Sequence, residues 1–275
     1  MTQKLSDAIA RRFGSSVGLM DAEQSPLRGT TEPSSRSSAV PLVNSGARTP
    51  RWGLGAFLLV ELVYLLVSLA FLPFFVHGKP MSASMLLLAV VVPTLAAAGL
   101  ALVITRLRGN GPRIDLRLQW SARGLGLGLL FGIGGLFITL PAALIYQSIV
   151  GPDANSAAGA LFSSVRASWP WAIIVFLVVA FVAPICEEVV YRGLLWGALE
   201  RRWGQWVALT VSTVVFALAH LELTRIPLLL VVAIPIALAR WYSGGLLASI
   251  VAHQVTNLLP GVVIMLGLVG AMPTN

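Results

Sequence analysis

The chain has 275 residues, of which 57% are hydrophobic and only 11% charged, and its mean hydropathy is +0.85. This composition excludes an ordinary soluble domain, which carries about 25% charged residues, and indicates a polytopic membrane protein. The net charge of +8 does not predict nucleic-acid binding, because the basic residues are spread over several separate loops. The single cysteine, Cys186, excludes an intrachain disulfide and a CxxC site.

Residues 1–50 are rich in Ser, Thr, Arg, Pro and Gly and show no apolar periodicity. Such a segment buries too little apolar surface to fold alone, so we expect a disordered cytoplasmic tail. Within it, residues 5–13 can form a short amphipathic helix on the membrane surface. No apolar stretch follows the first methionine, so we expect no cleaved signal peptide. Residues 51–275 are expected to form the transmembrane domain.

Seven apolar spans follow the tail, and most reach the roughly 20 residues that a helix needs to cross a bilayer. They lie at residues 52–76, 82–105, 125–150, 171–199, 203–221, 227–239 and 245–270. The sixth is short and contains Pro227 and Pro235, which predicts a bent, tilted or partly spanning helix. The fold class is therefore an all-α membrane bundle of seven to eight transmembrane helices, eight if the long third or fourth span is broken.

The basic residues predict the orientation of these spans. The tail carries seven of them, and the successive loops carry one, five, one, two, one and one, the last being Arg240. Because Lys and Arg are enriched in cytoplasmic loops, this alternation places the N-terminus inside and the C-terminus outside. All eight tryptophans fall at or near span ends, as expected for side chains at the membrane interfaces. The expected location is a bacterial plasma membrane.

Three glycines recur at every fourth residue near the start of the third span: Gly124, Gly128 and Gly132. This spacing places them on one helix face, where the absence of side chains lets a second helix approach closely. We therefore predict a tight helix–helix contact along this face.

The most unusual segment is Glu-Glu-Val-Val-Tyr-Arg at residues 187–192, inside an otherwise apolar span. Ionisable groups at bilayer depth cost about 2.5–3.5 kcal/mol each on insertion scales, so they are retained when they pair, face a wet cavity or do chemistry. Glu188 and Arg192 are four residues apart and share a helix face, which predicts an ion pair. Glu187 points about 100° away from Glu188 and is predicted to be the working group.

Two of the three histidines lie inside apolar spans, and each belongs to a one-turn pattern. Phe216 and His220 are four residues apart, as are His253 and Asn257, so each pair can share a helix face. His77 falls in an external loop and is expected to be solvated. Rough helix lengths allow both intramembrane histidines to meet Glu187 within the bilayer.

A carboxylate, two imidazoles and a carboxamide converging in a dry site are the parts of a hydrolase. Glu187 can accept a proton from water, while a neutral histidine orients that water or protonates the leaving amine. The other histidine and Asn257 can donate hydrogen bonds to a tetrahedral oxyanion, worth about 2.7–4 kcal/mol per donor in other enzymes. No Ser or Cys stands out as a nucleophile, although Cys186 adjoins Glu187.

Metal binding is the competing chemistry. Glu187, His220 and His253 are all possible zinc ligands, with water in the fourth position. There is no HExxH, so the ligands would come from three separate helices. Glu61, another carboxylate in the first span, is expected to be a packed or hydrogen-bonded helix residue, with membership of the site as the alternative.

Together, Glu-Glu-x-x-x-Arg at 187–192, Phe-x-x-x-His at 216–220 and His-x-x-x-Asn at 253–257 resemble the three motifs of the CPBP intramembrane proteases. That family, also called Abi, is related to the type II CAAX prenyl endopeptidases. The resemblance covers a motif-bearing core at residues 165–270, where every motif position matches. It implies an all-helical peptidase acting on membrane-associated proteins or peptides within the lipid bilayer.

The resemblance also implies roles for individual residues. Four would be catalytic, two activating water and two holding the oxyanion: Glu187 and His220, then His253 and Asn257. Three would be supporting: Glu188, Arg192 and Phe216. Members are often described as metalloproteases, but the family also supports a metal-free glutamate mechanism, which we favour over a divalent metal such as zinc.

Two other classes of function stay open at this stage. One is a non-enzymatic membrane partner, such as a bacteriocin-immunity protein, built on the protease fold. The other is a transporter, which rests only on intramembrane ionisable groups and lacks inverted repeats or paired broken helices. The family's substrates include prenylated CAAX proteins and bacteriocin precursors, and the sequence selects neither. Nucleic acid is not an expected partner.

Overall fold

A computed structural model describes residues 48–76, 82–154 and 156–271, and these residues form helices and connecting loops without a strand. Only the last three residues of the predicted tail, 48–50, are described. Residues 5–13 and His77 lie outside the described residues. The described part belongs to one compact unit, Gly46–Asn275. The predicted all-α class is therefore confirmed.

Helices α2 (Leu54–Val76) and α3 (Ala83–Arg108) pack against each other and are followed by the short α4 (Pro112–Asp115) and the long α5 (Ala122–Val150). A single turn and α6 (Ala157–Ser163) lead into a continuous helical stretch at Trp169–Trp203. The last three helices are α10 (Gln205–Ala219), α11 (Ile226–Ser243) and α12 (Leu246–Leu268).

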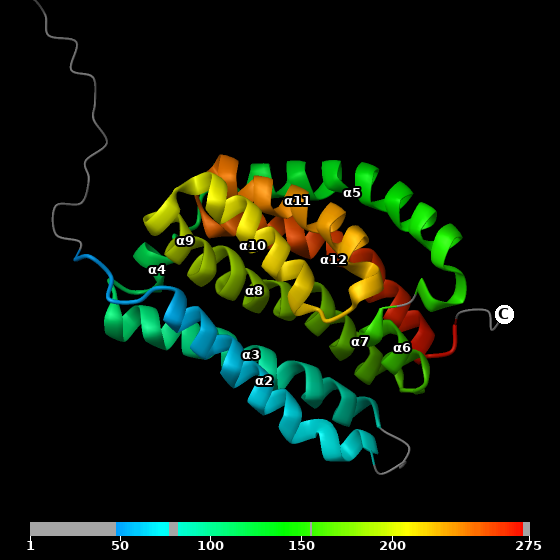
Figure 1. Ribbon diagram of the computed structural model, residues 1–275. Helices are drawn as coiled ribbons and strands as arrows, with labels where there is room; N and C mark the ends of the chain where they lie inside the picture. The colour runs from blue at the N-terminus through cyan, green and yellow to red at the C-terminus, as the bar shows by residue number, and fades with distance from the viewer. Residues whose placement is uncertain (1–47, 77–81, 155, 272–275) are drawn as a thin grey trace, which may run out of the picture. The chain divides into compact units, whose positions relative to one another are not determined.

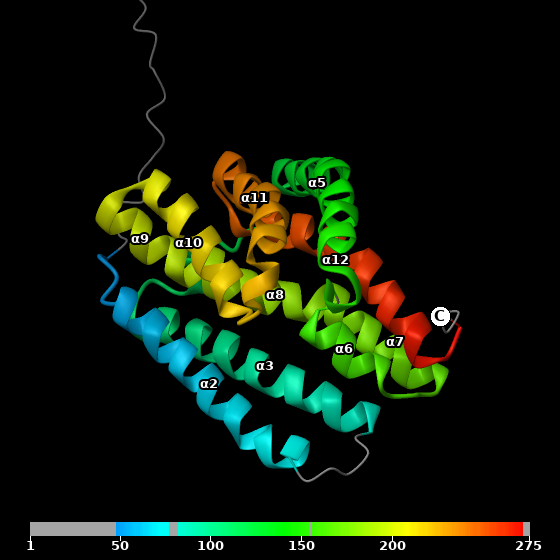
Figure 2. The ribbon, with the colours of Figure 1, turned by 45° about the vertical axis from the view of Figure 1, so that its right-hand side comes forward.

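The stretch Trp169–Trp203 lies between two groups of helices (Figures 1 and 2). It consists of α7 (Trp169–Leu177), η2 (Val178–Val182), α8 (Ala183–Glu188), η3 (Val189–Leu195) and α9 (Trp196–Trp203). On one side it contacts α2 and α3, and on the other it contacts α12 and α10. The segment with the two glutamates therefore has protein on both sides.

The predicted spans correspond one for one to helices, but their lengths differ from the expectation. Six described helices are long and apolar enough to cross a membrane, and Gln205–Ala219 is a seventh, shorter apolar helix. The third and fourth spans are not broken, so the count of seven to eight is matched only roughly. The sixth span is not the short one: α11 has 18 residues, because Pro227 lies in its first turn, where a missing N–H costs nothing.

The three glycines of the third span form the contact between α5 and α12, as predicted. Gly124, Gly128 and Gly132 are buried, and their nearest neighbours across the interface are Leu247, Val251 and Val255 respectively. A Cβ at position 132 would lie 2.8 Å from the Cβ of Val255 and 3.1 Å from the Cα of Ala252. The two backbones therefore approach as closely as glycine allows.

We expect Gly132→Ala to destabilise the protein by about 1–3 kcal/mol, because the added methyl group forces two packed helices apart. Gly134→Ala is the matched control, since a Cβ at that exposed position meets nothing within 4 Å. Thermal unfolding of the purified proteins in detergent measures the difference. Equal transition temperatures for the two variants would contradict this description of the interface.

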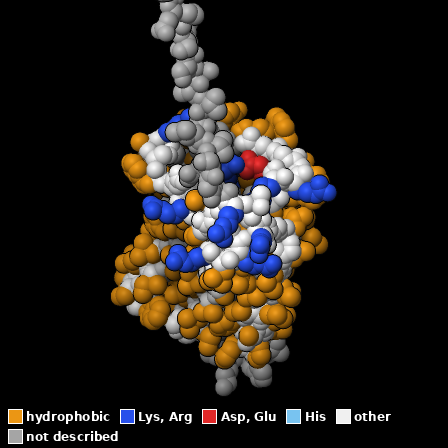
Figure 3. Space-filling view, turned by 90° about the vertical axis from the view of Figure 1, so that its left-hand side faces the viewer, with side chains coloured by type: hydrophobic (Ala, Val, Ile, Leu, Met, Phe, Trp, Pro, Cys, Tyr) orange, Lys and Arg blue, Asp and Glu red, His pale blue; other side chains and the backbone are white. Residues whose placement is uncertain are grey.

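Basic side chains gather at one end of the bundle, which Figure 3 views directly. There Arg51 N–H donates to the carbonyl of Arg108, Arg201 donates to the carbonyl of Trp52, and Arg117 pairs with Glu200 at 3.1 Å. These contacts join the tail, the second loop and the end of α9, which are predicted cytoplasmic segments. Among the described residues, Arg166 lies at the opposite end, where its Nη1 donates to the carbonyl of Gly267 near the end of α12.

Two assignments made from the sequence are wrong. Arg240 is not a loop residue: it is buried in α11, and its Nε donates a 3.1 Å hydrogen bond to the backbone carbonyl of Arg192. Trp196 is not at an interface, because it is fully buried, with the guanidinium of Arg240 5.3 Å from its ring centroid. Both residues lie in the interior near the first motif.

Candidate active site

The first motif lies on a helix that two π-helical segments interrupt. Residues Val178–Val182 and Val189–Leu195 are π-helical and flank the six α-helical residues Ala183–Glu188. Pro184 explains the first change, because its ring lacks an N–H and clashes with the carbonyl four residues back, which a wider turn relieves. Short π-helical turns are frequent at functional sites. Pro184 is the sequence signal that could have predicted this feature.

The predicted ion pair between Glu188 and Arg192 is present. Arg192 Nη1 lies 2.9 Å from Glu188 Oε1, and both side chains are fully buried. The guanidinium also stacks over the ring of Phe216, with its Cζ 4.2 Å from the ring centroid. Glu187 differs from its neighbour, because 29% of its side-chain surface stays accessible. Glu188 is thus buried and paired, whereas Glu187 is partly accessible.

His253 lies between the two glutamates, which the sequence did not predict. Its Nδ1 is 3.0 Å from Glu188 Oε1, and its Nε2 is 3.7 Å from Glu187 Oε2. A carboxylate paired with Arg192 can only accept, so Nδ1 of His253 carries the hydrogen of this bond. In the neutral ring, Nε2 then presents its lone pair towards Glu187. The 3.7 Å separation is too long for a direct hydrogen bond.

His220 directly follows the last residue of α10 and forms its C-cap. Its Nδ1 lies 2.8 Å from the carbonyl oxygen of Phe216, and the two rings are 4.8 Å apart. Because a carbonyl oxygen only accepts, Nδ1 donates, and Nε2 is the acceptor in the neutral ring. Phe216 thus contacts His220 with both its backbone and its ring, and its ring centroid is also 5.6 Å from that of His253.

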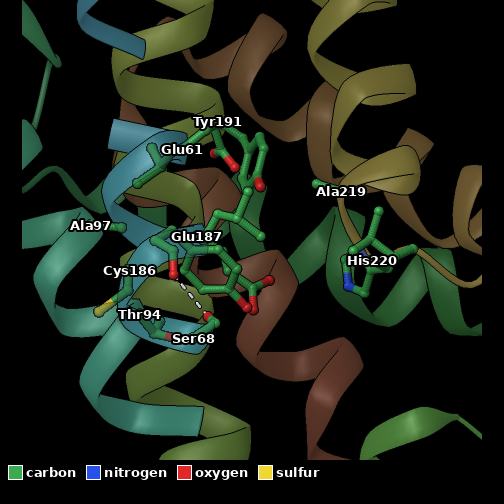
Figure 4. Close-up of a pocket in the computed structure, with 13 residues that line it drawn as sticks. Glu61, Ser68, Thr94, Ala97, Cys186, Glu187, Tyr191, Ala219 and His220 are labelled. Atoms are coloured by element: carbon green, nitrogen blue, oxygen red, sulfur yellow. Dashed lines mark hydrogen bonds between the residues drawn. The ribbon is translucent and has the colours of Figure 1, made fainter. Parts of the chain in front are cut away.

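A cavity of about 310 Å³ opens beside the first motif (Figure 4). It brings together Glu187 and His220, which approach from different helices. The residues that line it are Glu61, Tyr64, Leu65, Ser68, Thr94, Ala97, Cys186, Glu187, Val190, Tyr191, Ala219, His220 and Leu221. His253 and Asn257 are not among them, so the cavity joins only two of the four candidate catalytic residues.

The first span also contributes to this cavity. Glu61, Tyr64, Leu65 and Ser68 share one face of α2 and line the wall opposite His220. Glu61 therefore lines the cavity, while its interaction with the phenol of Tyr191 also fits the favoured interpretation of a packed or hydrogen-bonded helix residue. The available signal was the spacing of polar residues at positions 61, 64 and 68 within an apolar span.

Asn257 contacts the first π-helical segment. Its Nδ2 donates a 3.2 Å hydrogen bond to the carbonyl of Val179, and Gln254 one turn earlier donates to the carbonyl of Phe181 at 3.5 Å. These amides satisfy carbonyl groups where the winding of the helix changes. An Asn amide has two N–H donors, so this bond leaves Asn257 one donor for a further partner.

The zinc site that the sequence left open is not preformed in the described part of the chain. Within the described part of the chain, no group of three or more His, Cys, Asp and Glu side chains is arranged to hold a metal ion. His253 Nδ1 is directed to Glu188, and His220 Nδ1 to a backbone carbonyl. Both bonds leave Nε2 of the ring free, as in metal-ligating histidines, so metal binding by Glu187, His220 and His253 stays an alternative to the metal-free mechanism.

The fold and the site define a polytopic membrane protein with a carboxylate–imidazole cluster near the middle of its 35-residue helix Trp169–Trp203. Residues 169–259 match the family described as type II CAAX prenyl endopeptidase Rce1-like. The matched region contains all three motifs, and the resemblance predicted from them is confirmed.

Two curated proteins resemble parts of the chain. "Putative membrane peptidase YdiL" of Bacillus subtilis (strain 168) is 28% identical over 139 residues, which are 48% of this chain and 55% of that protein. An "Uncharacterized 24.3 kDa protein" of Escherichia coli is 29% identical over 92 residues, 32% of this chain and 42% of that protein. The chain thus spans about half the length of the curated relatives it matches. No solved structure matches it significantly.

Proposed function

We propose that the protein is an intramembrane endopeptidase that hydrolyses peptide bonds of membrane-associated proteins or peptides. The observation that carries the proposal is the shared cavity: Glu187 and His220, from different helices, line one space inside an apolar bundle. The match to an endopeptidase family and a relative named as a membrane peptidase support the same chemistry.

In the proposed reaction, Glu187 accepts a proton from a water molecule held between its carboxylate and Nε2 of His220. The oxygen of that water forms a bond to the carbonyl carbon of the substrate, and the carbonyl oxygen becomes an oxyanion. Collapse of this intermediate breaks the C–N bond, and the proton held by Glu187 passes to the leaving nitrogen. Glu187 is suited to this role because, unlike Glu188, it is accessible and has no buried guanidinium partner.

His253 and Asn257 are proposed to stabilise the oxyanion. Asn257 retains one N–H donor, and His253 donates from Nε2 when it is protonated. The Glu188 carboxylate orients the ring, because it accepts the hydrogen bond from Nδ1. In this assignment Glu188 and Arg192 position His253, and Phe216 separates the two histidine rings.

The orientation proposed for the protein has its basic end on the cytoplasmic side of a bacterial plasma membrane. Support comes from the arginines gathered there, since cytoplasmic loops carry an excess of Lys and Arg.

The test is a comparison of protein termini in membranes from source cells that express wild type or Glu187→Gln at matched levels. New termini found only with wild type would establish proteolysis and identify candidate substrates. Identical termini, with a folded variant that keeps the cellular phenotype, would refute the peptidase and favour a non-enzymatic partner on the same fold.

We expect cleavage to continue after metal removal, because activation of the water is assigned to Glu187 and His220 without a metal ion. Purified protein dialysed against a strong chelator should retain its rate to within about twofold on any substrate found above, since no bound metal ion is asked to activate the water. Loss of activity that added Zn²⁺ restores would overturn this assignment. A zinc enzyme that does not depend on metal for folding serves as the positive control.

A further inference from the structure

The wall of the cavity is acidic, a feature that the proposed reaction does not use. It holds two carboxylates, Glu61 and Glu187, and no Lys or Arg is found among the residues described as lining it. Carboxylates at membrane depth are rare and almost always have a partner. Three carboxylates lie in this region, Glu61, Glu187 and Glu188, and they differ in their basic partners.

Glu61 differs from the other two. Glu188 is paired with Arg192 at 2.9 Å, and Glu187 has the imidazole of His253 at 3.7 Å. Over the described parts of the chain, no Lys, Arg or His nitrogen lies within 4.0 Å of the Glu61 carboxylate. Its polar partner is the phenol of Tyr191, a neutral donor. Among these three carboxylates, Glu61 thus has neither a guanidinium nor an imidazole partner within the described residues.

The neighbours of Glu61 on α2 also present acceptors to the cavity. Tyr64 and Ser68 follow it on the same helix face, and both line the cavity. The hydroxyl of Ser68 donates its hydrogen to the carbonyl of Tyr64 at 2.8 Å, the dashed line in Figure 4. Its lone pairs therefore remain as acceptors. A ligand group beside this face meets oxygen acceptors, one of them a carboxylate.

We propose that Glu61 is a specificity-determining residue that binds a cationic side chain, Lys or Arg, of the peptide segment presented to Glu187. This inference rests on the proposed function, because it names the class of substrate for the same cavity. A lysine ammonium or an arginine guanidinium brings several N–H donors and a positive charge to this wall, which offers acceptors and negative charge. An uncharged or acidic side chain of similar length finds no such match.

The experiment measures binding and not cleavage. The protein carries Glu187→Gln, so that peptides stay intact, and it is reconstituted in lipid nanodiscs. The probes are two fluorescent, otherwise apolar peptides that differ only at one central position, Lys in one and Gln in the other. We expect the Lys peptide to have a Kd about tenfold lower, the size of one charge-assisted hydrogen bond. Adding Glu61→Gln should make the two Kd values equal.

Two further variants separate charge from packing. Glu61→Lys should reverse the preference, so that a peptide with Glu at the central position binds better than the Lys peptide. Tyr191→Phe removes only the phenolic oxygen and keeps the ring that packs on Phe57 and Phe216, so the Lys preference should persist. Loss of the preference in Tyr191→Phe, with no reversal in Glu61→Lys, would show that Glu61 only packs against Tyr191.

Equal Kd values for the Lys and Gln peptides in protein that retains Glu61 would overturn the proposal, and this comparison needs no variant at position 61. A Lys preference that survives Glu61→Gln would overturn it as well. Because binding is measured in a variant made to be inactive, these outcomes do not depend on catalysis. Failure of wild type to cleave the Lys peptide it binds would refute the peptidase and leave the binding site intact.

Discussion

Replacing Glu187 by Gln is expected to lower the rate of peptide cleavage by about 10²–10⁴-fold, the usual contribution of a positioned general base. The substitution keeps the size of the side chain and removes only its ability to take a proton. Glu187 lines the cavity, and 29% of its side chain is accessible. The substitution therefore leaves no buried charge without a partner. The unfolding temperature should therefore stay within a few degrees of wild type.

The measurement is a single-turnover rate on a peptide substrate, with the folded fraction determined on the same sample. Glu61→Gln is the matched control, because it removes a second carboxylate from the same cavity wall. We expect it to weaken binding of cationic peptides without abolishing cleavage of uncharged ones. A Glu187→Gln enzyme that cleaves at the wild-type rate would remove Glu187 from the proposed chemistry.

Replacing Arg192 by Met is expected to destabilise the protein by about 3–5 kcal/mol, the cost of leaving a buried charge without its partner. Glu188 is fully buried, and Arg192 is its only guanidinium partner at hydrogen-bond distance within the described residues. The variant also loses the stacking of the guanidinium on Phe216. Folded yield and the midpoint of unfolding in detergent should both fall further than in Glu187→Gln.

A double variant tests whether the stranded charge is the cause. Glu188→Gln combined with Arg192→Met removes both charges and keeps an oxygen that accepts the hydrogen bond from His253 Nδ1. Because replacing a buried ion pair by neutral groups is often close to neutral, the double variant should be more stable than Arg192→Met alone. If it is less stable, the pair does more than neutralise charge, and the supporting role assigned to it is wrong.

Sequence alone was enough for features that depend on one helix at a time. The positions of the apolar spans follow from the lack of charge over about 20 residues, and the Glu188–Arg192 pair follows from four-residue spacing. The glycine face of α5 was predictable for the same reason, since its spacing defines one side of a helix whatever lies opposite. Each of these predictions needs only the geometry of a regular helix.

The tertiary structure decided which faces meet and at what depth. It placed His253 between Glu187 and Glu188, brought α2 and Glu61 to the cavity, and buried Arg240 against the carbonyl of Arg192. These outcomes depend on the rotation and axial shift of each helix against its neighbours, and the π-helical turns beside Pro184 alter both. Hydropathy and spacing do not encode such shifts. The three motifs thus named the catalytic candidates, and packing between the helices determined which of them share the cavity.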